Sequence, residues 1–255
     1  MSAPIMAGAE PESIDGGPNG ALVLHGFTGN CNSMRGIAHA LARAGFTVEL
    51  PLLPGHGTTV EDMNATTWSD WSAAAEETLE KLQARVDEAD GGGKVVVVGL
   101  SMGGSLTAWL GTRHPELAGL AFINPAVTMP AEMRDGAQAL LDSGTEYLDG
   151  IGSDIADPDS TETAYEKTPV KPLLSLLDAE HATHPHLRNI SCPSLIITSR
   201  QDHVVPPENS DDLAGAVSGP VERIWLERSY HVATLDFDKA DVEQAVVDFA
   251  KRVTS

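Results

Sequence analysis

The sequence predicts an α/β fold in which a mostly parallel β-sheet is flanked by helices. Short apolar, β-branched runs alternate with segments of helical periodicity along the chain, and the run Val95–Val98 is apolar at every position. A strand of this composition is typical of a sheet whose two faces are both covered, and such sheets are parallel. Alternation of strands and helices implies right-handed crossover connections between neighbouring parallel strands.

The individual elements follow this alternation in order. Thr67, with Asp70 three residues later, has the pattern of a capping box at the start of the second helix. The residues that follow Lys94 are too branched, and the run is too short, for a helix. The strands are expected at residues 21–24, 46–50, 94–98, 120–123, 194–198 and 223–226, and the helices at residues 33–44, 70–88, 105–112 and 240–253.

Residues 126–189 interrupt the alternation. No strand-like run is expected there, only short helical patches broken by glycine and proline. We therefore expect a core domain made of residues 1–125 and 190–255, with residues 126–189 inserted above the sheet as a small cap. An apolar face in this insertion is expected to pack on the sheet domain, to line a flexible acyl pocket, or to do both. Its members are Met129, Met133, Leu140, Leu141, Leu148 and Ile151.

Composition limits the function classes. The chain has 255 residues and a formal net charge of −21, which argues against nucleic-acid binding and against docking by charge on an anionic membrane. No apolar run of about 18 residues is present, so no integral membrane segment is predicted. Cys31 and Cys192 make no disulfide framework and the N-terminus resembles no secretory signal, so a cytoplasmic location is expected. The oligomeric state is left open between monomer and dimer.

One motif carries chemistry. Gly99-Leu100-Ser101-Met102-Gly103-Gly104 follows the strand at 94–98 and precedes a helical pattern. In that context G-x-S-x-G predicts a sharp strand-to-helix turn that exposes a nucleophilic serine, Ser101, at the carboxyl edge of the sheet. The alternative is a glycine-rich helix start without chemistry.

A nucleophilic serine needs a base, and the base needs an acid that orients it. Asp202 follows the strand at 194–198, and only His203 and His231 come after it. His203 adjoins the acid and can hardly reach the serine, so His231, which follows the strand at 223–226, is the predicted base. The alternatives are a turn aspartate and a loop histidine without catalytic roles.

Two backbone N–H groups are predicted to hold an oxyanion. Met102 follows the nucleophile at a helix N-terminus, and Phe27 lies in the glycine-containing stretch His25–Gly29 after the first strong strand. His56, between two glycines, is interpreted as a turn histidine. His181, His184 and His186 are not expected to hold a metal, because Pro185 interrupts any helix that would align them. The sequence predicts no metal and no cofactor.

Five motifs resemble those of a known family. They are His25–Gly29, Leu53–Gly57, Gly99–Gly104, Asp202–Pro206 and Ser229–Val232, and together they look like the small bacterial carboxylesterases and monoacylglycerol lipases of the α/β-hydrolase superfamily. The likeness runs from about Gly17 to Val253. It implies an α/β-hydrolase fold and a serine esterase that works through an acyl-enzyme, with a small cap over an acyl-binding pocket.

The same resemblance implies the substrate class and two pocket residues. The expected substrates are small neutral, lipid-like esters, either monoacylglycerols or short-to-medium acyl esters. Within the cap, Ile151 would be an apolar gate to the acyl tunnel and Glu162 a carboxylate near the glycerol. A thioesterase or lactonase with the same triad, or a non-catalytic hydrolase fold that binds a ligand, are the alternatives, since fold alone does not separate them.

Overall fold

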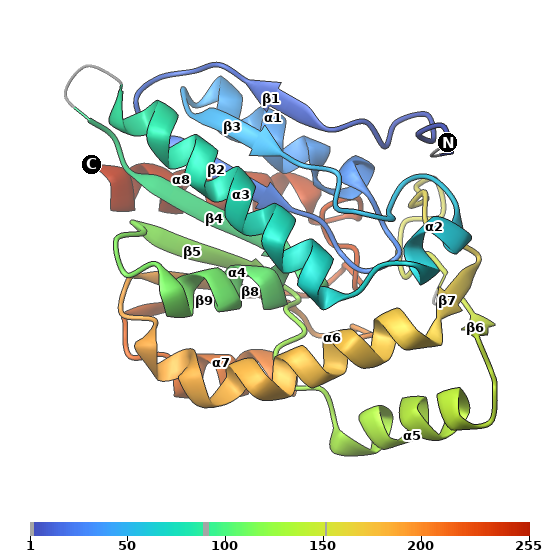
Figure 1. Cartoon of the computed structure of the whole chain (residues 1–255). Helices are drawn as coiled ribbons and strands as arrows, with labels where there is room; N and C mark the ends of the chain where they lie inside the picture. Colours follow the sequence, from blue (N-terminus) through green and yellow to red (C-terminus); the bar gives the residue numbers. More distant parts are fainter. Residues whose placement is uncertain (1–2, 89–91, 151) are drawn as a thin grey trace.

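A seven-stranded, mostly parallel sheet forms the centre of the molecule (Figure 1). The computed structural model describes residues 3–88, 92–150 and 152–255. Strand order is β1-β3-β2-β4-β5-β8-β9; β1 pairs antiparallel with β3, and all other neighbours are parallel. The strands are β1 (Glu12–Ile14), β2 (Gly20–Leu24), β3 (Thr47–Leu50), β4 (Val95–Leu100), β5 (Gly119–Ile123), β8 (Ser194–Ser199) and β9 (Val221–Leu226).

Helices cover both faces of this sheet, as the sequence predicts. Along β4, Val96 and Val98 join the core on one face, while Val95 and Val97 join the core on the other. The first face is covered by α1 (Arg35–Arg43) and α8 (Lys239–Thr254). The second is covered by α3 (Trp68–Asp87), α4 (Met102–Arg113), α6 (Val170–Thr183) and α7 (Glu208–Ala216). The predicted α/β class with a mostly parallel sheet is confirmed.

The predicted capping box is present at the start of α3. The Thr67 N–H donates to Asp70 Oδ2 at 2.8 Å, and the helix begins at Trp68, before the expected residue 70. Three further short elements connect the layers: η1 (Cys31–Met34), α2 (Val60–Asn64) and η2 (His184–Asn189). No helix among the described residues combines the length and the apolar character that crossing a membrane requires.

The expectation that residues 126–189 contain no strand is wrong. β6 (Tyr147–Asp149) and β7 (Lys167–Pro169) form a small antiparallel pair there, and each has only 3 residues, too few to show an alternating pattern. The segment also contains α5 (Ala131–Asp142), which packs on the outside of α6 (Figure 1).

Most of the predicted apolar face of this segment packs between α5 and α6. Met129, Leu140, Leu141 and Leu148 all join a cluster centred on buried residues of those two helices. Met133 instead is 41% exposed on α5. Ile151, the remaining member, lies outside the described residues.

A buried carboxylate joins α6 to α4. Glu180 is 3% exposed, and its Oε1 lies 3.3 Å from the hydroxyl oxygen of Ser105. Its Oε2 is buried and has no hydrogen-bond partner among the described residues. Burial raises the pKa of Glu180 from 4.5 to about 8, so the folded protein holds a proton that the unfolded chain releases between those two pH values. The stability of the fold therefore falls as pH rises through this window.

Glu180→Gln is expected to stabilise the protein at alkaline pH. The neutral amide removes the cost of burying a charge, so the melting temperature should match the parent at pH 5 and exceed it by about 5 °C at pH 9. Thermal unfolding of both proteins across this range measures the difference. Glu132→Gln, on the exposed part of α5, is the control that should show no such trend. A melting-temperature difference that stays constant with pH would contradict the account.

Candidate active site

Ser101 lies on a strained turn between β4 and α4. Its φ of +56° places a non-glycine residue in the left-handed region, which is costly and persists only where the surroundings enforce it. Close packing around two glycines holds Ser101 in this conformation. A Cβ on Gly99 would lie 2.0 Å from the Gly103 carbonyl oxygen, and one on Gly103 would lie 2.2 Å from the Leu24 carbonyl oxygen. Without these side chains the first turn of α4 packs tightly against β4 and β2, and Ser101 sits at the carboxyl edge of the sheet.

The structure brings Asp202 and His231 together. Asp202 Oδ2 lies 2.7 Å from His231 Nδ1, while Asp202 Oδ1 accepts the N–H groups of Val204 at 2.9 Å and Val205 at 2.8 Å. The Asp202 side chain is 1% exposed, so these contacts are shielded from water. A carboxylate at Nδ1 favours the tautomer in which Nδ1 carries the proton, and Nε2 is then free to accept one.

His203 does not join this pair, in agreement with the sequence argument. Its Nδ1 lies 2.8 Å from Asp154 Oδ1, and its ring packs edge to face against Tyr230. The side chain is 60% exposed. His203 therefore faces solvent beside the site, and His231 is the histidine that Asp202 orients.

A small cavity of about 40 Å³ gathers most of the predicted site residues. Ser101 and His231 both line it, together with Phe27 and Glu162. Asp202 lies behind His231, and Met102 is buried as the first residue of α4. The other lining residues are Gly26, Thr28, Leu100, Gly152, Asp154, Val204 and Val232.

The loop after β2 lies close against Ser101. A Cβ on Gly26 would lie 3.3 Å from the Ser101 Cβ, so this position has little room for a side chain. The N–H groups in the first turn of a helix have no acceptor within the helix, and the helix dipole adds positive potential there. Phe27 lines the same cavity as Ser101, and Met102 is the first residue of α4. Their N–H groups stay the predicted oxyanion donors.

Two neutral histidines support this loop from behind. His25 Nδ1 donates to the Gly26 carbonyl at 3.0 Å, and its Nε2 accepts the Leu53 N–H at 3.2 Å. The His56 ring packs edge to face against the rings of His25 and Phe27, and its Nδ1 lies 3.1 Å from the Pro54 carbonyl. Burial lowers the pKa of His25 to about 4 and that of His56 to about 3. Both rings therefore stay uncharged at neutral pH and act as packing groups.

Glu162 reaches the cavity from the segment before β7. Its Oε1 lies over Gly29, 2.7 Å from where a Cβ would be, so the absence of a side chain at Gly29 makes room for the carboxylate. The nearby His231 and the Ser33 hydroxyl both favour the charged form of Glu162 and so act to lower its pKa. Burial outweighs both effects and raises the pKa of Glu162 to about 7. Ile151, the predicted gate, lies outside the described residues.

Sequence reasoning missed Asn124, which holds the main chain of His231. Asn124 Nδ2 donates to the His231 carbonyl at 2.7 Å and to Ser199 Oγ at 3.0 Å, and its Oδ1 accepts the Ser199 N–H at 2.7 Å. Its φ of +43° is a backbone conformation that asparagine tolerates better than most residues. The available signal was its position immediately after β5, at the same sheet edge as Ser101.

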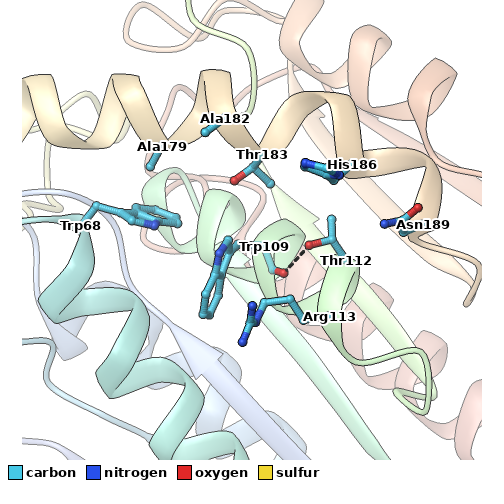
Figure 2. Close-up of a pocket in the computed structure, with 9 residues that line it drawn as sticks. All are labelled: Trp68, Trp109, Thr112, Arg113, Ala179, Ala182, Thr183, His186 and Asn189. Carbon is cyan, nitrogen blue, oxygen red and sulfur yellow. Dashed lines mark hydrogen bonds between the residues drawn. The ribbon is translucent and has the colours of Figure 1, made fainter.

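Larger cavities lie away from Ser101. One of about 390 Å³ lies between α3, α4, α6 and η2, and Figure 2 shows its lining, with Trp68 and Trp109 on one side and His186 and Asn189 on the other. Another of about 600 Å³ lies beside α5 and α6. Neither is lined by any of the predicted site residues, most of which surround the smaller cavity beside Ser101.

Comparisons with known proteins agree with this geometry. The model of a family described as "Alpha/beta hydrolase family" matches residues 21–245 of the chain. A thermostable monoacylglycerol lipase of Bacillus sp. (strain H-257) is 46% identical over 253 residues, covering 97% of each chain. A carboxylesterase of Bacillus subtilis (strain 168) is 27% identical and covers 96% of this chain and 97% of that protein.

A solved structure extends the comparison to the fold. It comes from work on two metagenome-derived lipolytic enzymes, LipS and LipT, and is 40% identical with a TM-score of 0.91, covering 98% of this chain and all of that one. The resemblance inferred from the five sequence motifs is confirmed. The chain belongs to the α/β-hydrolase family.

Proposed function

We propose that the chain is a serine carboxylic-ester hydrolase that acts on neutral, lipid-like esters, and specifically a monoacylglycerol lipase. The observation that carries this proposal is the 2.7 Å contact between Asp202 and His231 beside Ser101, whose turn holds it in a strained conformation. The 46% identity to a monoacylglycerol lipase supports the substrate class.

The residues of the cavity suit acyl transfer in two steps. Ser101 Oγ attacks the ester carbonyl while His231 Nε2 takes its proton, and Asp202 holds the imidazole and stabilises its cation. The N–H groups of Phe27 and Met102 donate to the oxyanion of the tetrahedral intermediate. Its collapse expels the alcohol, which takes the proton from His231. Water, deprotonated by His231, then attacks the acyl-enzyme; the acid leaves and Ser101 regains its proton.

Residues 126–189 act as the cap in this proposal, over a core made of residues 1–125 and 190–255. The carboxylate of Glu162 reaches the cavity beside Ser101 from this segment and would accept hydrogen bonds from the alcohol part of a monoacylglycerol. Ile151 stays assigned to the gate by resemblance alone. A cytoplasmic location, supported by the two free cysteines, belongs to the same proposal.

A substrate panel tests the function. Initial rates are measured with p-nitrophenyl esters of short to long acyl chains, with mono-, di- and triacylglycerols, and with a thioester and a lactone. We expect turnover of the simple esters and, among the glycerides, a preference for monoacylglycerol. Turnover of the thioester or the lactone alone would contradict the ester-hydrolase assignment. If no substrate is turned over, the remaining alternative is a non-catalytic hydrolase fold that binds a ligand.

Glu162→Gln is expected to reduce the monoacylglycerol preference. A hydrogen bond to a charged acceptor contributes about 1.5–3 kcal/mol, so kcat/KM for monoacylglycerol should fall by roughly 10-fold while that for an ethyl ester of the same acid stays within 2-fold. Because the pKa of Glu162 is raised to about 7, the carboxylate is charged only above that pH. The ratio of the two kcat/KM values should therefore rise between pH 6 and 8 in the parent and stay flat in the variant.

The matched control is Glu166→Gln, an exposed carboxylate a few residues further along the same segment. This variant should keep the parent's ratio and its pH dependence. An unchanged ratio in both Glu162→Gln and Glu162→Ala would remove the role of Glu162 in glycerol recognition.

A further inference from the structure

One segment crosses the carboxyl edge of the sheet and closes the cavity over Ser101. We name residues 152–165 the strap. At its C-terminal end, the Tyr165 N–H donates to the Thr28 carbonyl at 3.3 Å and the Tyr165 hydroxyl donates to the Gly55 carbonyl at 2.8 Å. At its N-terminal end the strap contacts residues 227–238, which we name the histidine loop because it carries His231. The strap thus bridges the loop of Phe27 and the loop of His231.

Asp154 makes the contacts nearest to the reacting groups. Its Oδ2 accepts the main-chain N–H of His231 at 3.0 Å and that of His203 at 3.2 Å. Its Oδ1 lies 2.8 Å from His203 Nδ1, and its own carbonyl accepts the Val232 N–H at 3.1 Å. The Asp154 side chain is 15% exposed and lines the same cavity as Ser101. One carboxylate therefore binds the loop that carries the acid and the loop that carries the base.

A second carboxylate holds the strap in place without touching His231. Asp236 is fully buried. It accepts two strap N–H groups, those of Ala156 at 2.7 Å and Asp157 at 3.0 Å, and two of the histidine loop, those of Tyr230 at 2.8 Å and Phe237 at 2.7 Å. Removing the Asp154 side chain therefore leaves the strap attached to the histidine loop.

We propose that Asp154 is a positioning residue: it fixes the main chain of His231 relative to Asp202 and so keeps the imidazole aligned between the acid and Ser101. This inference rests on the proposed function. Asp154 does not contact substrate atoms in this role. It acts through two main-chain N–H groups. One belongs to His203, which follows the acid Asp202 in the chain, and the other belongs to the base His231 itself. Because proton transfer requires donor and acceptor to be aligned closely, a shift of about 1 Å in the ring lowers the rate strongly.

Substitutions at position 154 can separate the ability of Asp154 to accept hydrogen bonds from its negative charge. The oxygen of an asparagine can occupy the Oδ2 position and accept both N–H groups, while its amide donates to a neutral His203 Nδ1. Alanine provides no acceptor. Asp154→Asn should therefore keep His231 in place, and Asp154→Ala should not.

The experiment measures kcat and KM of the parent, Ser101→Ala, Asp154→Ala and Asp154→Asn on a p-nitrophenyl ester, with the rate of labelling by a fluorophosphonate as a second readout. Asp154→Ala should lower kcat and the labelling rate by about 10–100-fold, with KM within 2-fold of the parent. Asp154→Asn should restore both to within about 3-fold. Asp159→Ala, an exposed carboxylate on the same strap, should match the parent throughout.

Circular dichroism and melting temperature show which variants are folded. If Asp154→Ala does not fold, Asp154→Ser, whose hydroxyl is too short to reach both N–H groups, replaces it with the same expected loss. Parent-like kcat in a folded Ala or Ser variant overturns the role of Asp154, and so does an asparagine variant as slow as alanine. Equal ester turnover by the parent and Ser101→Ala instead overturns the proposed function, which separates the two failures.

Discussion

Ser101→Ala is expected to lower kcat/KM for ester hydrolysis by at least about 10⁴-fold, because it removes the hydroxyl that we propose forms the acyl-enzyme. The remaining rate would come from binding and from the proposed oxyanion donors, the N–H groups of Phe27 and Met102. Labelling by a fluorophosphonate should disappear completely. Steady-state rates on a p-nitrophenyl ester and mass spectrometry of the labelled protein measure both effects.

The fold should survive this change. Alanine is slightly smaller than serine, and the strained φ of +56° is enforced by the packing around Gly99 and Gly103 rather than by the hydroxyl. The control is Ser143→Ala, an exposed serine after α5 whose hydroxyl bonds to the Leu140 carbonyl at 2.7 Å and not to the site. Activity of Ser101→Ala near that of the parent would refute Ser101 as the nucleophile.

Asp202→Asn is expected to lower kcat by about 10³–10⁴-fold while the structure around it stays in place. The asparagine oxygen can still accept the N–H groups of Val204 and Val205, but its amide then faces His231 Nδ1. That amide is a donor, so it favours the tautomer with the proton on Nε2, which cannot take a proton from Ser101. His231→Ala should cost at least as much.

Asp211→Asn is the matched control for Asp202→Asn. Asp211 is an exposed carboxylate on α7 that pairs with Arg223, away from the cavity, and its loss should leave kcat within 2-fold of the parent. KM for Asp202→Asn should change little, because the substituted atoms do not line the cavity. Parent-like kcat for both Asp202→Asn and His231→Ala would show that another base serves Ser101.

The sequence predicts the centre of the molecule well because local patterns encode it. The all-valine run of β4 requires burial on both faces. The two glycines around Ser101 lie where a Cβ would come within 2.0 and 2.2 Å of main-chain oxygens, so no other residue fits there. Asp202 and His231 follow from the rule that chemistry gathers at the carboxyl ends of parallel strands. Each of these inferences needs only a strand and the residues that follow it.

What the sequence does not predict depends on contacts between distant residues. β1, with 3 residues, exists because it pairs with β3, and β6 and β7 are equally short. Asp154 lies 77 residues from the N–H of His231, and Asn124 lies 107 residues from the carbonyl it binds. An aspartate or asparagine in a loop satisfies many local roles, so neither position stands out until the fold brings its partners to it.

Asp154 and Asp236 join the strap to its neighbouring loops chiefly through main-chain N–H groups, which every residue except proline provides. Ala156, Asp157 and Tyr230 each contribute such a group. The side chains at these positions are therefore free to vary while the loop geometry is kept. Substitutions along the strap can therefore change the lining of the cavity while Asp154 and Asp236 keep the strap joined to the histidine loop.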